Sequence, residues 1–232
     1  AYHLVGTATD PDGDVLYYMW EQHNSPQPGR ITVTSDNFGD NLTEGPIARS
    51  LKPSRSNERY IPRLSQILEG KLGERNPGVN STWETVSSVK RTLKWAFVVM
   101  DKTLGRRDLM ETDLTTGNTV YSGMKINVTN NAGPFEVTSQ NKKTYWFVGK
   151  THTITWNVAD TDKEEVNTQQ VNILFALDGQ TFTHTLAANI PNNGIYTFTA
   201  TADLITNNGR FMIRPVGNIY LAVNLDKIIV KT

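Results

Sequence analysis

Three aspartates at alternate positions lie in the segment Asp10-Pro11-Asp12-Gly13-Asp14, and their spacing could build a metal site. Calcium takes about six to eight oxygen ligands, and carboxylates spaced in this way beside a glycine can surround one ion. Asp101 follows an expected strand at 93–99, and it would reach the same end of a sheet if that strand lies beside the one after the aspartates. We therefore predict a candidate calcium site formed by Asp10, Asp12, Asp14 and Asp101. The alternative is an ordinary turn, in which the aspartates accept hydrogen bonds from nearby backbone amides.

The chain has no other recognisable reaction centre. Its four histidines, at positions 3, 23, 152 and 184, form no HExxH zinc motif, and the lack of cysteine excludes thiolate zinc sites and cysteine nucleophiles. The serine-hydrolase and nucleotide-binding motifs GxSxG, GxxxxGK[ST] and GxGxxG are missing as well. We therefore predict no catalytic residue and no zinc in this chain. Two carboxylates that meet in space could still hydrolyse a glycosidic bond, and that alternative stays open.

The five tryptophans divide into two groups. Trp20, Trp95 and Trp156 lie in strand-like segments in which every second residue is apolar, which predicts that they are core residues. Trp83 and Trp146 are candidate exposed contacts, because a flat indole can stack on a sugar ring. For Trp83 the alternative is that it pins a long loop to the sheet.

Period-two alternation of apolar and polar residues recurs along the chain, while helical periodicity is almost absent, so we predict an all-β protein. The segment Asn-Asn-Ala-Gly-Pro at 130–134 interrupts the pattern. We expect two tandem immunoglobulin-like antiparallel β-sandwiches, one at residues 1–130 and one, also similar to fibronectin type III domains, at 131–232. The first carries an insertion at about 23–88, in which apolar spacing over 64–68 predicts one short helix.

The 23 basic and 23 acidic side chains cancel over the whole chain but not along it. Residues 1–48 carry a net charge of −6 and residues 49–94 a net charge of +6, so we expect the insertion to fold back onto the acidic part. A neutral domain does not favour nucleic acid as a partner, and no apolar run is long enough to insert into a membrane. The alternative is a polyanion site formed by five cations of the insertion, namely Arg49, Lys52, Arg55, Arg59 and Arg63.

Many short blocks of the sequence resemble one family. In the first part these blocks are GTATDPDGDVLYYMWEQ (6–22), GPIARS (45–50), RYIPRL (59–64) and TWETV (82–86). In the second part they are AGPFEVTS (132–139), TITWNV (153–158), VNIL (171–174), DG (178–179) and VGNI (216–219). Together they resemble the paired modules that follow the catalytic domain in secreted bacterial reprolysin-like zinc metalloproteases. The TDPDGD turn also resembles that of polycystic-kidney-disease-type (PKD-like) sandwiches.

The resemblance implies a non-catalytic accessory region of a secreted zinc metallopeptidase. Such a region would space, stabilise or position a protease domain in cis, or bind its substrate or the cell surface. The expected location is therefore secreted or cell-surface, in a bacterial exported protein, and the expected partner is a protein or cell-surface ligand that can be a glycan. Calcium is the one cofactor expected in this chain. The alternative function is an adhesive or carbohydrate-binding module of a secreted protein that has no protease.

Overall fold

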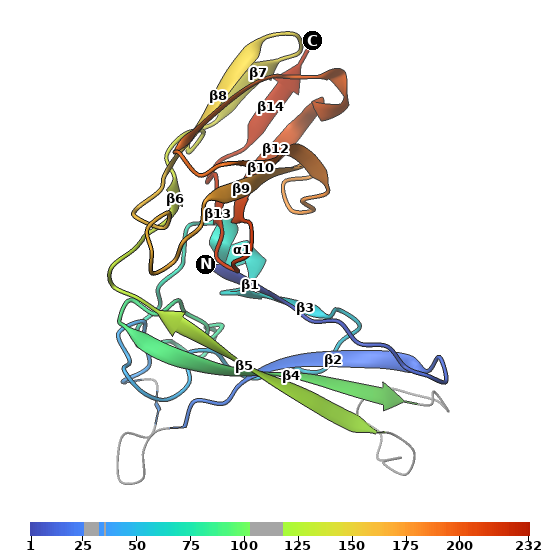
Figure 1. Cartoon of the computed structure of the whole chain (residues 1–232), viewed down its shortest axis with the longest axis vertical. Coiled ribbons are helices and arrows are strands. Elements are labelled where there is room, and N and C mark those ends of the chain that lie inside the picture. The colour runs from blue at the N-terminus through green and yellow to red at the C-terminus, as the bar shows by residue number, and fades with distance from the viewer. Residues whose placement is uncertain (26–32, 35, 103–117) are drawn as a thin grey trace. The chain divides into compact units, whose positions relative to one another are not determined.

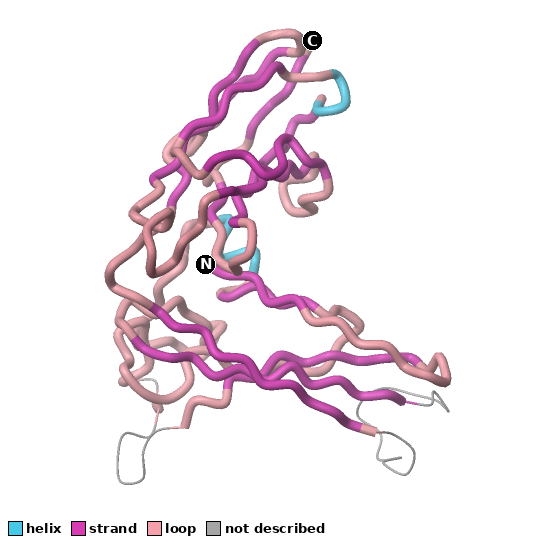
Figure 2. The backbone as a smooth tube through the Cα atoms, viewed as in Figure 1, coloured by secondary structure: helices cyan, strands magenta, loops and turns pink. Residues whose placement is uncertain are grey.

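The computed structural model describes residues 1–25, 33–34, 36–102 and 118–232. Strands dominate this part of the chain, with one short α-helix and one 3-10 turn, so the predicted all-β fold is confirmed (Figures 1 and 2). The described residues divide into two compact units. The first unit comprises His3–Arg63 and Gly73–Thr129, and the second comprises Ala1–Tyr2, Leu64–Leu72 and Asn130–Thr232.

The first unit is a small sandwich of two layers. One layer is an antiparallel sheet of strand order β2-β4-β5, with β2 at Val15–Gln22, β4 at Arg91–Lys102 and β5 at Thr119–Val128. The other pairs β1 (Tyr2–Val5) with β3 (Glu58–Ile61) (Figure 1).

Aromatic side chains fill the space between these two layers. Trp20 is 6% exposed and contacts Phe97, with ring centroids 4.7 Å apart, while its indole N–H donates to the carbonyl of Asn57. Gly6 runs so close to Phe97 that a Cβ at this position would lie 2.3 Å from the ring. The prediction that Trp20 and Trp95 are core residues is therefore confirmed.

The second unit is a larger sandwich of two sheets. One sheet has the order β10-β9-β12-β14-β7, with β13 paired to β12, and the other has the order β11-β8-β6. β7 runs parallel to β14, whereas the sequence predicted antiparallel strands throughout. The strands are β6 (Glu136–Val137), β7 (Thr144–Phe147), β8 (Thr151–Asn157), β9 (Gln170–Ala176), β10 (His184–Pro191), β11 (Ile195–Thr199), β12 (Thr206–Pro215), β13 (Ala222–Val223) and β14 (Ile228–Lys231), and the 3-10 turn covers Ala202–Leu204.

An apolar core joins the two sheets of the second unit. Trp156 is 4% exposed in this core, as predicted, and its indole N–H donates to the side chain of Asn192 over 2.9 Å. Asn192 in turn donates to Thr161 and to the backbone of Thr168, so the one polar group of the tryptophan is satisfied within the core. The core residues are Val137, Trp146, Ile154, Trp156, Val171, Ile173, Phe175, Ala187, Leu204, Phe211, Ile213, Ala222, Ile228 and Val230.

The predicted short helix is present as α1 (Leu64–Leu68). It belongs to the second unit, as do Ala1–Tyr2, although both segments precede the expected boundary at residue 130. Arg210 holds the end of the helix, because its Nη1 donates to the carbonyl of Leu68 over 2.8 Å and to that of Asn224 over 3.1 Å. These bonds supply a donor to a carbonyl that the helix itself cannot satisfy.

A buried ion pair organises the long segment between β2 and β4. Arg59 on β3 donates from Nη2 to Oε1 of Glu84 over 2.7 Å, and the two side chains are 7% and 1% exposed. Arg59 also donates to the carbonyls of Trp20 and Arg49, over 2.5 and 2.6 Å. The second oxygen of Glu84 accepts from the backbone N–H of Arg63 over 3.0 Å. Both Nη atoms of Arg59 and both oxygens of Glu84 thus have hydrogen-bond partners, which is what makes the burial of the two charges tolerable.

A second ion pair lies within the same segment. The guanidinium of Arg75 pairs with the carboxylate of Asp40. The hydrogen bond from Arg75 lowers the pKa of Asp40 below its ordinary value. The pair joins the acidic residues 1–48 to the basic residues 49–94, but both partners lie within the insertion, so the expectation that the insertion folds back onto the acidic part stays a prediction.

We predict that Glu84→Ala lowers the free energy of unfolding by about 3 to 5 kcal/mol, because it leaves the buried guanidinium of Arg59 without its counter-charge. Urea denaturation followed by tryptophan fluorescence measures this loss. Arg63→Ala is the matched control, since its side chain is 47% exposed and 3.7 Å from Glu84, and we expect it to cost less than about 1 kcal/mol. A Glu84→Ala protein as stable as the wild type would contradict the importance of the pair.

Candidate functional site

The carboxylate of Asp10 is the hydrogen-bond acceptor within the Asp10–Asp14 turn. Oδ1 of Asp10 accepts from the backbone N–H of Asp12 over 3.0 Å and of Asp14 over 2.9 Å. Asp101 lies opposite Leu16 on the neighbouring strand, as expected, but its carboxylate accepts from the backbone and side chain of Asn118. Among the described residues, no three His, Cys, Asp or Glu side chains come together as a metal site. The observed bonds thus correspond to the turn interpretation, and calcium binding stays a prediction.

Neither tryptophan proposed as an exposed contact has a freely exposed ring. Trp146 is 1% exposed in the core of the second unit, so the expectation for this residue is wrong. Trp83 is half-buried, and its ring packs on Phe38 with centroids 5.2 Å apart. Because Phe38 is itself buried, this contact favours the alternative that Trp83 pins the insertion.

The five cations of the suggested polyanion site do not form one open cluster. Arg59 is buried in its ion pair, and Arg63 lies against the same carboxylate. The guanidinium of Arg55 lies over the ring of Tyr17, 5.5 Å from its centroid. A polyanion would have to displace these contacts, so the structure does not favour this alternative.

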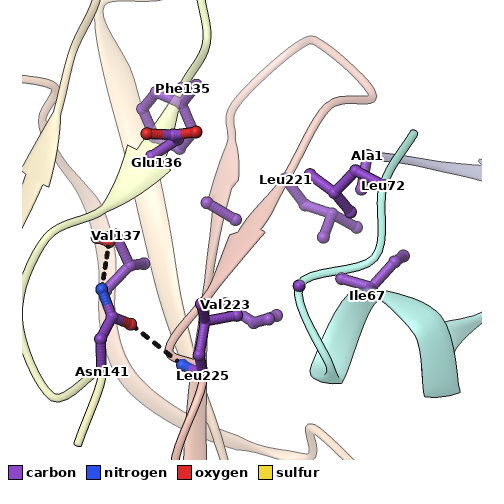
Figure 3. A pocket seen from close by; sticks show the side chains of 12 residues that line it. Ala1, Ile67, Leu72, Phe135, Glu136, Val137, Asn141, Leu221, Val223 and Leu225 are labelled. Atoms are coloured by element: carbon purple, nitrogen blue, oxygen red, sulfur yellow. Dashed lines mark hydrogen bonds between the residues drawn. The ribbon is translucent and has the colours of Figure 1, made fainter. Parts of the chain in front are cut away.

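A pocket of about 190 Å³ in the second unit lies between α1 and the strands β6 and β13 (Figure 3). Its walls are mostly aliphatic, with Glu136 as the one carboxylate among the lining residues. The side chain of Asn141 faces it, but its amide donates to the carbonyl of Val137 over 2.8 Å and its oxygen accepts from the N–H of Leu225 over 3.0 Å. The pocket therefore offers apolar space rather than groups that could carry a reaction.

Exposed aromatic rings and lysines lie together on the outer face of β7 and β14. Tyr145 and Phe147 on β7 are 44% and 45% exposed, while Trp146 between them points into the core. β7 is the last strand of its sheet (Figure 1), and Tyr145 lies opposite Ile229 of β14. We call this set the aromatic–lysine face: Lys143, Tyr145, Phe147, Lys227 and Lys231.

Positive charge surrounds the exposed tyrosine. The ammonium groups of Lys143 and Lys231 lie over the Tyr145 ring, 5.4 and 5.2 Å from its centroid. A hydrogen bond and the charge of Lys143, with the charges of Lys231 and Lys227, lower the pKa of the Tyr145 hydroxyl below its ordinary value. The face therefore combines flat apolar rings with cations, which suits a partner that has apolar surface and negative charge.

Sequence analysis missed this face because it placed the wrong ring of an aromatic triplet outside. In a strand, neighbouring side chains point to opposite faces, so Tyr145 and Phe147 share one face and Trp146 the other. A partial signal lies in β14, which pairs with β7 in parallel: Lys231 opposite Phe147 is charged and Val230 opposite Trp146 is apolar, although Ile229 opposite Tyr145 is apolar too.

No protein-family model and no curated protein sequence matches this chain. Among solved structures, it is similar to fibronectin(III)-like modules of CbhA from Clostridium thermocellum, with 13% identity and a TM-score of 0.27, over 70% of this chain and 75% of that one. It is also similar to the N-terminal four Ig domains of Dscam1 isoform 6.9, with 8% identity and a TM-score of 0.26, over 99% of this chain. The chain spans only 40% of that structure. Sequence identities and TM-scores this low support no inference about function. The β-sandwich assignment rests on the strands described above.

We predict that Asp10→Ala lowers the free energy of unfolding by roughly 0.5 to 1.5 kcal/mol, because two backbone amides lose their acceptor. Thermal unfolding measures the change, with Asp12→Ala as the control that leaves both bonds in place. After treatment with EDTA, a wild-type melting temperature that millimolar calcium leaves unchanged would favour the turn interpretation. A rise with calcium that Asp12→Asn abolishes would instead establish the calcium site.

Proposed function

We propose that this chain is a non-catalytic binding region, and that its aromatic–lysine face contacts an anionic glycan surface. The observation that carries the proposal is the pair of exposed rings, Tyr145 and Phe147, on a strand whose intervening residue Trp146 is held in the core. Because Trp146 is fixed, the two rings are presented on a rigid support rather than on a loop. Such preorganisation reduces the entropy lost on binding.

The chemistry of the face favours acidic sugars over neutral ones. Residues two apart on a strand lie about 6.6 Å apart along its axis, so the two rings form one short apolar strip. Sugar rings present apolar C–H faces that can pack on such a strip. The ammonium groups of Lys143 and Lys231 over the ring of Tyr145 can then pair with a carboxylate or sulfate of the same sugar.

The proposed context is an accessory region of an exported bacterial zinc metallopeptidase, and the sequence blocks that resemble the modules of reprolysin-like proteases support it. There the face would hold the protease at its substrate or at the cell surface. The second candidate is an adhesive module of a secreted protein without a protease, which the same face would serve equally well. An HExxH-containing domain encoded before Ala1 selects the first context, and a full gene without one selects the second.

Binding to polysaccharides tests the proposal. We expect the chain to bind an immobilised polyuronate and to bind a neutral polymer of matched length at least about ten-fold more weakly, because only the acidic polymer pairs with the lysines. Tyr145→Ala and Phe147→Ala should each weaken binding by about ten-fold, which corresponds to about 1.4 kcal/mol for a lost ring contact. Raising the salt concentration should also weaken binding of the wild-type chain to the polyuronate, because salt screens the lysine charges.

Two exposed residues outside the face serve as matched controls. Ile195→Ala removes an apolar side chain that is 52% exposed on β11, and Lys163→Gln removes an exposed cation that already pairs with Asp162. Neither should change the affinity. Equal binding to acidic and neutral polymers, or binding that survives loss of both rings, would contradict the proposal.

A further inference from the structure

The strand β5 ends the three-stranded sheet of the first unit with a long open edge. It pairs with β4 along ten residues, from Thr119 opposite Met100 to Val128 opposite Arg91. On its other side no strand among the described residues pairs with it (Figures 1 and 2). An edge of this length is a template for another extended chain, because its backbone donors and acceptors are aligned for pairing.

One hydrogen bond shows which residues of β5 point away from β4. The N–H of Asp101 donates to the carbonyl of Asn118 over 3.1 Å, which continues the register of the pair. Backbone groups of successive residues point to opposite sides of a strand, so the even-numbered residues from 118 to 128 face β4. The odd-numbered residues therefore direct their N–H and C=O groups outward, and these are Thr119, Tyr121, Gly123, Lys125 and Asn127.

Side chains on both faces of this edge are uncovered. Val120 is 62% exposed and Tyr121 is 75% exposed, and they project to opposite faces of the sheet. A strand added along the edge would cover both at once. Native edge strands usually carry several charges that discourage pairing, whereas β5 contains only Lys125.

We propose that the occupant of this edge is β5 of a second copy of the chain, paired antiparallel about a twofold axis at Gly123. This register places Tyr121 opposite Lys125 of the other copy and Gly123 opposite Gly123. It also places Val120 opposite Ile126, an apolar pair that occurs twice. The proposal is independent of the glycan-binding function.

Charge favours this register over the one centred on Lys125. Centring the axis on Lys125 would set the two ammonium groups directly opposite each other, which is destabilising. Centring it on Gly123 instead sets each ammonium beside an aromatic ring, an attractive contact. It also pairs all five outward-facing residues with a partner in the other copy, so the two sheets join into one of six strands.

Sedimentation and cysteine cross-linking test the pairing. We expect the molar mass to rise from 25.9 kDa toward twice that value as the concentration increases. Tyr121→Pro should keep the protein at the monomer mass, because proline removes an outward donor without disturbing the bonds to β4. A protein that stays monomeric at all concentrations would overturn the proposal.

The cross-linking experiment does not require the Tyr121→Pro variant to fold. Gly123 has room for a side chain, since an added Cβ would lie 3.9 Å from the nearest atom, the carbonyl oxygen of Trp95. Residues directly opposite in a hydrogen-bonded pair have Cα atoms about 5.5 Å apart, which a disulfide can bridge. Gly123→Cys, in this cysteine-free chain, should therefore form a covalent dimer under mild oxidation.

Ser122→Cys is the matched control. In the proposed register it lies opposite Met124, so two such cysteines would be diagonal neighbours about 7 to 8 Å apart and should cross-link far less. Equal cross-linking of the two variants would overturn the register, and so would a Gly123→Cys protein that dimerises by sedimentation but does not cross-link.

Discussion

The buried pair of Arg59 and Glu84 is the interaction on which the first unit depends. The described part of the segment that joins β2 to β4 has few regular elements, so much of its order must come from contacts other than strand and helix hydrogen bonds. The pair ties four stretches together, because Arg59 also bonds the carbonyls of Trp20 and Arg49, and Glu84 accepts from the N–H of Arg63. A buried charge without its partner is costly, so this geometry is strongly specified.

The second unit is held together by an apolar core instead of a buried ion pair. Its two sheets enclose an apolar core, in which Trp146 packs near Phe175 and Phe211, with ring centroids 5.7 and 6.3 Å away. Fixing that indole inside directs Tyr145 and Phe147 outward. In both units the surface proposed to contact a partner lies on the last strand of a sheet, β7 in one and β5 in the other.

Periodicity predicted the parts of this structure that depend on local pattern. The all-β class, the short helix, and the buried positions of Trp20 and Trp156 all follow from the spacing of apolar residues. Trp146 was placed outside because three consecutive aromatic residues do not reveal which face is buried, and the packing of its ring near Phe175 and Phe211 decides it. The ion pair escaped prediction because its partners are 25 residues apart, and nothing local links them. The aspartate turn was recognised, but its spacing fits both an ion and the backbone amides that it bonds.

Hydrogen exchange tests most directly whether the ion pair holds the insertion. The N–H of Arg49 donates to the carbonyl of Trp83, and that of Thr85 donates to the carbonyl of Ile47, so these amides report on the tied stretches. We expect Glu84→Gln to speed their exchange at least ten-fold, while the amide of Trp156 in the second unit, bonded to Gly194, stays as protected as in the wild type. Unchanged protection of Arg49 and Thr85 in the variant would contradict the account.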